Sequence, residues 1–148
     1  MTAGKGADVE MSVVHVLVVD DSPCWQEFTR MHLEKDPNLY IVATASNGSW
    51  AVRTAEALQP DLILLDVSLP GMDGIEAARQ IRVAAPRAAI LFVSGECDPE
   101  IVQAALRAGG DGYIDKLEAG RELRAGIEAV LLGKRFLSRG LAGLDSQS

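Results

Sequence analysis

Five short apolar runs recur along the chain, and longer amphipathic stretches separate them. Each run is apolar at consecutive positions rather than at alternate ones, which is the pattern of strands covered on both faces, as in a parallel sheet. We therefore predict five buried strands. The runs occupy residues 13–20, 39–45, 61–66, 88–93 and 112–114.

The stretches between the runs carry the end signals and the periodicity of helices. Ser22 suits the cap of a helix and Pro23 its first position, and Asp98 and Pro99 repeat this arrangement later in the chain. Apolar residues recur on one helical face over residues 123–131. The remaining predicted helices lie near residues 48–58 and 74–84.

Strands and helices that alternate with short loops predict an α/β fold built on a doubly wound parallel sheet of five strands. Right-handed crossovers between five such units fit the flavodoxin-like strand order 2-1-3-4-5. The length of 148 residues fits a single domain. We expect a disordered N-terminal tail over residues 1–11, the domain itself over residues 12–132, and a linker or C-terminal tail over residues 133–148.

Composition excludes several classes of protein. The chain has 21 acidic and 14 basic residues, a net charge of −7, which argues against direct contact with nucleic acid. Two cysteines and two histidines stand in no metal-ligand spacing, which excludes a disulfide scaffold and makes a zinc enzyme improbable. No apolar run approaches the roughly 20 residues of a membrane span, and no secretory signal begins the chain. We expect a cytoplasmic protein without a membrane partner.

Polar residues follow the predicted strands at their carboxyl ends, where open α/β sheets bind ligands. The first predicted strand ends at Asp20 and Asp21, the third at Asp66, the fourth at Ser94, and the fifth at Asp115 and Lys116. Carboxylates that converge on one rim repel each other unless a cation neutralises them. Oxygen ligands without histidine or cysteine select Mg²⁺, for which Mn²⁺ could substitute. Such a pocket, beside a lysine and a hydroxyl group, suits phosphoryl transfer to a carboxylate.

These motifs resemble those of the receiver domains of response regulators in two-component signal transduction. The matching segments are VLVVDDS (16–22), DLILLDVSLPGMDG (61–74), FVSG (92–95) and GYIDK (112–116). The resemblance covers roughly residues 12–138, nearly the whole chain. It implies a phosphorylation-activated switch that accepts a phosphoryl group from a histidine kinase or a histidine phosphotransfer protein in a Mg²⁺-dependent reaction.

The resemblance also implies a role for each residue of the pocket. Asp66 would be the phospho-acceptor and a metal ligand, Asp21 a direct Mg²⁺ ligand, and Asp20 a ligand acting through water. The backbone carbonyl of Ser68 would complete the protein's share of the metal site.

Three further residues would respond to the phosphoryl group. Lys116 would pair with its oxygens, and Ser94 would hydrogen-bond to it and move toward it. Tyr113 would be the aromatic switch that turns inward as Ser94 moves. In this interpretation the chain is no enzyme beyond catalysing its own phosphorylation and dephosphorylation, and a homodimer on phosphorylation is one option.

The segment 112–138 is similar to the receivers of the NarL/FixJ group, which carry a LuxR-type DNA-binding output domain. Two alternatives stay open: the chain is the regulatory part of a transcription regulator, or it is a receiver that acts alone. Leu117 stands where many receivers have proline, and Ser68 and Glu96 occupy the positions that tune loss of the phosphoryl group. The sequence therefore leaves the lifetime of the phosphorylated form open.

Two functions from other classes compete with the switch. A small α/β phosphohydrolase with an aspartyl nucleophile would use similar chemistry, but its D-x-D motif on the first strand is replaced by Asp20 and Asp21. A flavin-binding or nucleotide-binding module would need a phosphate loop after the first strand, where these two carboxylates would repel phosphate.

Overall fold

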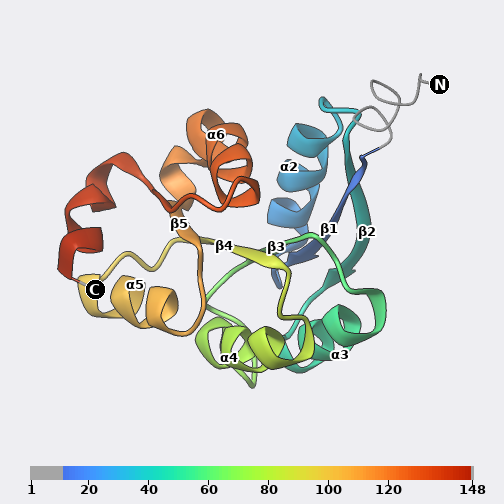
Figure 1. Cartoon of the computed structure of the whole chain (residues 1–148), viewed down its shortest axis with the longest axis horizontal. Coiled ribbons are helices and arrows are strands. Elements are labelled where there is room, and N and C mark those ends of the chain that lie inside the picture. Colours follow the sequence, from blue (N-terminus) through green and yellow to red (C-terminus); the bar gives the residue numbers. More distant parts are fainter. Residues whose placement is uncertain (1–11, 148) are drawn as a thin grey trace.

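Strands and helices alternate along the whole of the computed structural model, which describes residues 12–147 (Figure 1). The predicted N-terminal tail lies outside the described residues. The alternating elements are β1 (Val14–Val19), α2 (Pro23–Leu33), β2 (Leu39–Ala45), α3 (Gly48–Leu58), β3 (Leu62–Leu65), α4 (Gly74–Ala84), β4 (Ala89–Ser94), α5 (Pro99–Arg107), β5 (Gly112–Asp115) and α6 (Ala119–Leu131), with a short 3-10 helix η1 (Lys116–Glu118) before α6.

The sheet is parallel throughout, with strand order β2-β1-β3-β4-β5-β6. This order confirms the predicted flavodoxin-like arrangement, but the predicted number of five strands was one short. The sixth strand, β6 (Phe136–Leu137), pairs with β5 inside the segment that the sequence suggested was a linker or tail. The pair of apolar residues between Arg135 and Ser138 is too short a run to be recognised as a strand.

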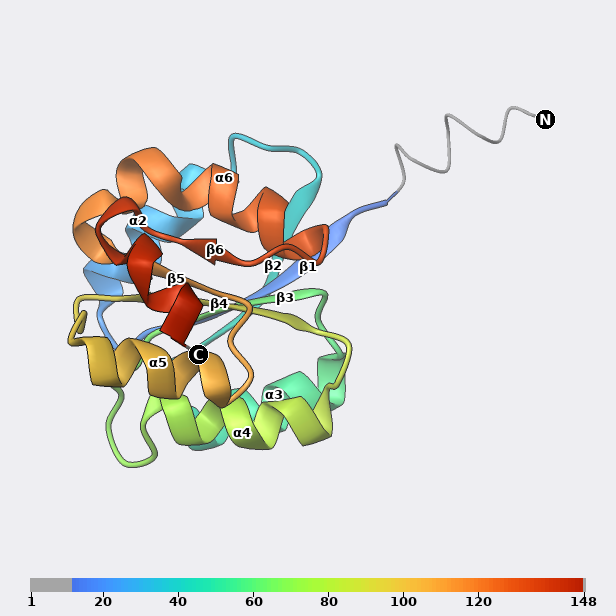
Figure 2. The ribbon, with the colours of Figure 1, turned by 60° about the vertical axis from the view of Figure 1, so that its left-hand side comes forward.

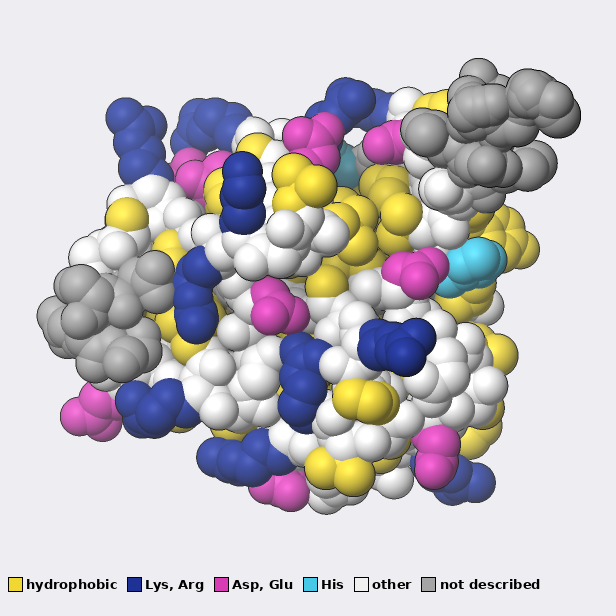
Figure 3. Space-filling model, in the orientation of Figure 1, with side chains coloured by type: hydrophobic (Ala, Val, Ile, Leu, Met, Phe, Trp, Pro, Cys, Tyr) yellow, Lys and Arg dark blue, Asp and Glu magenta, His cyan; other side chains and the backbone are white. Residues whose placement is uncertain are grey.

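Helices cover both faces of the sheet, which is why its strands are apolar at consecutive positions. In Figure 1, α2 and α6 lie on one face, and α3, α4 and α5 lie on the other. Successive strand residues point to opposite faces, so Leu17 packs toward one helix layer and Val16 and Val18 toward the other. An apolar groove of about 280 Å³ separates α2 from α6, and Figure 3 shows apolar side chains gathered there.

The predicted helix caps are present. The Ser22 hydroxyl accepts a hydrogen bond from the Trp25 N–H at 3.2 Å, so α2 begins directly after β1. The Asp98 carboxylate accepts one from the Glu100 N–H at 2.9 Å, which starts α5. Each cap satisfies a backbone donor that a helix end leaves free. None of the helices within residues 12–147 is long and apolar enough to cross a membrane.

The chain after α6 returns to the domain and packs on it. Ser138 is buried: its N–H donates to the Tyr113 carbonyl at 3.0 Å, and its hydroxyl accepts from the Asp115 N–H at 2.9 Å and donates to the Glu122 carboxylate. A 3-10 helix, η2 (Arg139–Gln147), follows beside α5, as Figure 2 shows. Leu141 of this helix is buried in the core layer that α5 covers.

Candidate functional site

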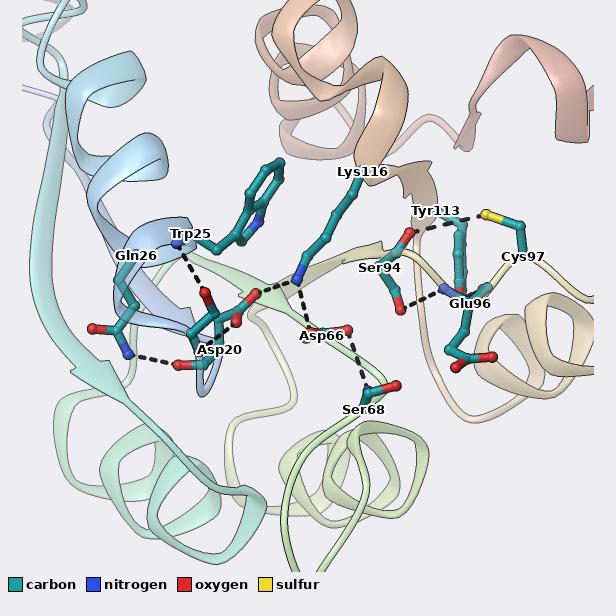
Figure 4. A network of polar contacts seen from close by, with 11 residues as sticks. Asp20, Trp25, Gln26, Asp66, Ser68, Ser94, Glu96, Cys97, Tyr113 and Lys116 are labelled. Carbon is teal, nitrogen blue, oxygen red and sulfur yellow. Dashed lines mark hydrogen bonds and ion pairs between the residues drawn. The ribbon is translucent and has the colours of Figure 1, made fainter.

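The carboxyl ends of β1 and β3 bring three carboxylates together (Figure 4). Asp20 follows β1 and is 2% exposed, and Asp66 follows β3 and is 4% exposed. Asp21 is exposed at the rim. One carboxylate oxygen from each of the three lies within 4.8 Å of the others, which is a spacing that can hold a metal ion.

Lys116, directly after β5, reaches into this cluster. Its ammonium group lies 2.8 Å from Asp20 Oδ2 and 3.0 Å from Asp66 Oδ2. The same group lies 4.9 Å from the centre of the Trp25 ring. Lys116 therefore joins the two buried carboxylates and is held against one aromatic face.

Charge in the pocket is only partly compensated. Burial raises the pKa of Asp20 above its ordinary value, against the hydrogen bonds from Lys116 and from the Ser22 N–H, which lower it. Burial alone would lower the pKa of Lys116, but its hydrogen bonds to Asp20 and Asp66 raise it above the ordinary value, so the ammonium stays charged. One ammonium group faces three carboxylates, and a divalent cation would remove the remaining repulsion.

The backbone fixes the direction of both buried carboxylates. The Ser22 N–H donates to Asp20 Oδ1 at 2.9 Å, and the Ser68 N–H donates to Asp66 Oδ1 at 3.2 Å. Gly74, the first residue of α4, lies directly against the loop that carries Asp66, and its N–H donates to the Val67 carbonyl at 2.8 Å. These bonds leave the second oxygen of each carboxylate to Lys116.

Ser94 and Tyr113 lie on the neighbouring strands β4 and β5, and both are fully buried. The Ser94 hydroxyl accepts a hydrogen bond from the Glu96 N–H at 3.1 Å. The Tyr113 hydroxyl donates to the Glu96 carbonyl, and burial raises the pKa of Tyr113 above its ordinary value. In this structure Tyr113 is already in an inward position, and its ring stacks on Phe92 at 5.7 Å.

The pocket thus unites Asp20, Asp21, Asp66 and Lys116, with Ser68 beside Asp66 and with Ser94 on the strand between β3 and β5. Trp25 is the neighbour that sequence reasoning missed. The spacing of Trp25, Phe28 and His32 indicated only a packing face of α2. Its position in the first turn after Asp21 is the signal that it lies at the pocket.

Cys97 lies shortly after β4, and we expect alkylating reagents to modify its thiol slowly. Its thiol donates a hydrogen bond to the Ser94 carbonyl at 3.9 Å, and burial raises the pKa of Cys97 to about 11. Iodoacetamide at pH 7.5 should therefore alkylate Cys97 far more slowly than the exposed Cys24, because only about one thiol in 3,000 is ionised. The rate at Cys97 should rise with pH up to about 11. Mass spectrometry of the Cys24→Ser variant measures the alkylation rate at Cys97 alone. In wild-type protein, equal alkylation rates at Cys24 and Cys97 at pH 7.5 would contradict the prediction.

The chain matches a known domain family and a curated relative over most of its length. The profile of the response regulator receiver domain matches residues 16–128. The nitrate/nitrite response regulator protein NarL of Escherichia coli K12 is 33% identical over 126 residues, which is 85% of this chain and 58% of NarL. The chain therefore spans little more than half the length of this curated relative.

Solved structures agree with this match. A two-component response regulator of the LuxR family from Aurantimonas sp. SI85-9A1 superposes with a TM-score of 0.86 at 34% identity, covering 92% of this chain and 97% of that one. RcsB, of which two dimers bound to DNA were solved, has a TM-score of 0.81 at 24% identity, covering 89% of this chain and 67% of RcsB, a likeness of fold alone. Our expectation that this chain makes no direct contact with nucleic acid is not borne out by these comparisons.

Proposed function

This chain belongs to the response regulator receiver domain family, and we propose that it is switched by phosphorylation of Asp66. The observation that carries the proposal is the cluster of Asp20, Asp21 and Asp66, with Lys116 at 3.0 Å from Asp66. A carboxylate held between a cation site and a lysine can attack phosphorus while both positive charges offset the charge of the transferred group. The family match does not favour the phosphohydrolase alternative.

The residues present fit a Mg²⁺ ion. All candidate donors are oxygens, and the three carboxylates already converge within 4.8 Å. We propose that Asp21 and Asp66 ligate the ion directly, that Asp20 acts through water, and that the Ser68 carbonyl completes the set. When bound, the ion would offset charge on the phosphoryl oxygens, and Mn²⁺ would serve in its place.

We propose that phosphorylation changes the structure at the ends of β4 and β5. We propose that the hydroxyl group of Ser94 bonds to the phosphoryl group and that Lys116 pairs with it. Ser94 and Tyr113 share Glu96 as a hydrogen-bond partner, so a movement of Ser94 would disturb the loop that holds the Tyr113 hydroxyl. This is a two-state element biased by new charge.

From this chemistry we also propose the partners of the chain. The donor would be a histidine kinase or a histidine phosphotransfer protein in the cytoplasm, and phosphorylation would promote a homodimer. The protein would regulate transcription through an output domain or act alone by protein contact. Its only catalysis would be its own phosphorylation and dephosphorylation.

Beryllofluoride, a phosphoryl mimic, tests the proposed switch. With Mg²⁺ present, fluorine NMR should show one bound adduct per chain, and the adduct should disappear when EDTA removes the metal. Absence of an adduct in folded wild-type protein would overturn the proposal. Sustained turnover of small phosphomonoesters would instead support the hydrolase.

Mg²⁺ should stabilise the native protein, because it relieves repulsion among carboxylates that only the folded chain brings together. At a concentration tenfold above Kd, the free energy of unfolding should rise by about 1.4 kcal/mol. Urea unfolding with and without Mg²⁺ measures this difference. Asp21→Asn should reduce the gain. Asp98→Asn, which retains a helix cap and lies outside the carboxylate cluster, should keep it. Equal gains in both variants would refute the site.

A further inference from the structure

Trp25 is held firmly at the pocket by both its backbone and its ring. Its N–H donates to the Ser22 hydroxyl at 3.2 Å, and its ring stacks on Phe28 with the two centres 4.4 Å apart. Phe28 in turn packs on His32 at 4.1 Å, so the three rings form a continuous row along α2. Figure 4 shows the indole beside the end of Lys116.

The ammonium group of Lys116 has three partners of different kinds: Asp20, Asp66 and the Trp25 ring. Asp20 also belongs to the carboxylate cluster, so its oxygens cannot serve Lys116 and a metal ion equally. Asp66 is the proposed acceptor, whose oxygen would be used in the new bond. The aromatic face alone keeps its attraction for the ammonium in every state of the pocket.

Trp25 also lines a small cavity at the two buried carboxylates. Behind the two buried carboxylates lies a cavity of about 10 Å³, and Trp25 forms part of its wall together with apolar residues of β1, β3 and β4. A cavity of this size has room for at most one water molecule. A smaller side chain at position 25 would enlarge this cavity.

We propose that Trp25 is a positioning residue for the reaction at Asp66: its ring holds the Lys116 ammonium within reach of the phosphoryl group. This inference rests on the proposed function, since it assigns Lys116 to the phosphoryl oxygens. The effect of losing the ring should be about fivefold on the rate, which is the size that a cation–π contact of about 1 kcal/mol gives.

The rate of phosphorylation by acetyl phosphate in Mg²⁺ tests the proposal. Trp25→Leu should lower the maximal rate about fivefold and leave the half-saturating acetyl phosphate concentration unchanged. Trp25→Phe, which retains an aromatic face, should stay within about twofold of wild type. The matched control is Trp50→Leu, because Arg53 lies 5.4 Å from the Trp50 ring in a similar contact but on the exposed start of α3. Equal rates in Trp25→Leu and wild type, or equal losses in the Leu and Phe variants, would overturn the inference.

Fluorescence of metal-free protein provides a readout that does not depend on activity. In a Trp50→Phe background, Trp25 is the only tryptophan. Lys116→Met should then change the emission of Trp25, because it removes the charge that lies 4.9 Å from the ring. Unchanged emission would contradict the contact. If wild-type protein accepts no phosphoryl group while the emission does change, the proposed function fails and the contact stands.

Discussion

Asp66→Asn is expected to abolish phosphorylation completely. An acyl phosphate needs a carboxylate oxygen as nucleophile, and the amide of asparagine provides none at this position. Wild-type protein incubated with acetyl phosphate and Mg²⁺ should gain about 80 Da, the mass of one phosphoryl group, and the variant should gain nothing. Mass spectrometry of the intact protein measures the difference.

The matched control is Asp61→Asn at the opposite end of the same strand. Asp61 is exposed, and its carboxylate accepts a hydrogen bond from the backbone N–H of His15 at 2.8 Å. It lies outside the carboxylate cluster, so this variant should be phosphorylated like wild type. A phosphoryl group on Asp66→Asn in a protein that unfolds as cooperatively as wild type would mean that another residue is the acceptor.

Gly74→Ala should have the largest effect on stability, although alanine is ordinarily the better helix former. A Cβ atom on Gly74 would lie 2.0 Å from the Asp66 carbonyl oxygen and 2.8 Å from Val67 Cα. Both atoms belong to backbone, so no side-chain rotation relieves the overlap, and α4 or the Asp66 loop must move. We expect a loss of at least about 3 kcal/mol in the free energy of unfolding, together with weaker Mg²⁺ binding.

Gly120→Ala is the control for this substitution, since a Cβ atom there meets nothing within 4 Å. Gly120 lies in the first turn of α6, and alanine should leave stability unchanged or raise it by up to about 1 kcal/mol. Urea unfolding compares both variants with wild type. A loss below about 1 kcal/mol for Gly74→Ala would show that the Asp66 loop moves easily. The hydrogen bonds of the Ser68 N–H to the Asp66 carboxylate and of the Gly74 N–H to the Val67 carbonyl argue against this.

The sheet and the members of the pocket could be predicted from the sequence because both depend on local pattern. Strands covered on both faces are apolar at every position, and the carboxyl ends of parallel strands share one edge. Asp20, Asp66 and Lys116 therefore had to converge once the strand order was known. The difference in burial between Asp20 and Asp21 was not predictable, because adjacent residues point to opposite sides and no pattern fixes which carboxylate turns inward.

Contacts between elements that are far apart in the chain could not be predicted from the sequence. Nothing in the first turn of α2 indicates that Trp25 meets Lys116, since 91 residues separate them in the chain. The need for glycine at position 74 likewise depends on how closely α4 approaches the loop after β3. Strand β6 was missed for a related reason: Phe136 and Leu137 acquire their structure from β5 rather than from their own sequence.

The return of the chain along β5 also covers a strand edge that could otherwise pair with another chain. Without residues 133–148, the outer backbone groups of Gly112 and Tyr113 would lose their partners in β6, and the apolar layer under Leu141 would face water. A bare strand edge beside exposed apolar surface is a template for edge-to-edge association. A polypeptide that ends at residue 132 should therefore aggregate at concentrations where the longer chain does not, and light scattering would reveal it.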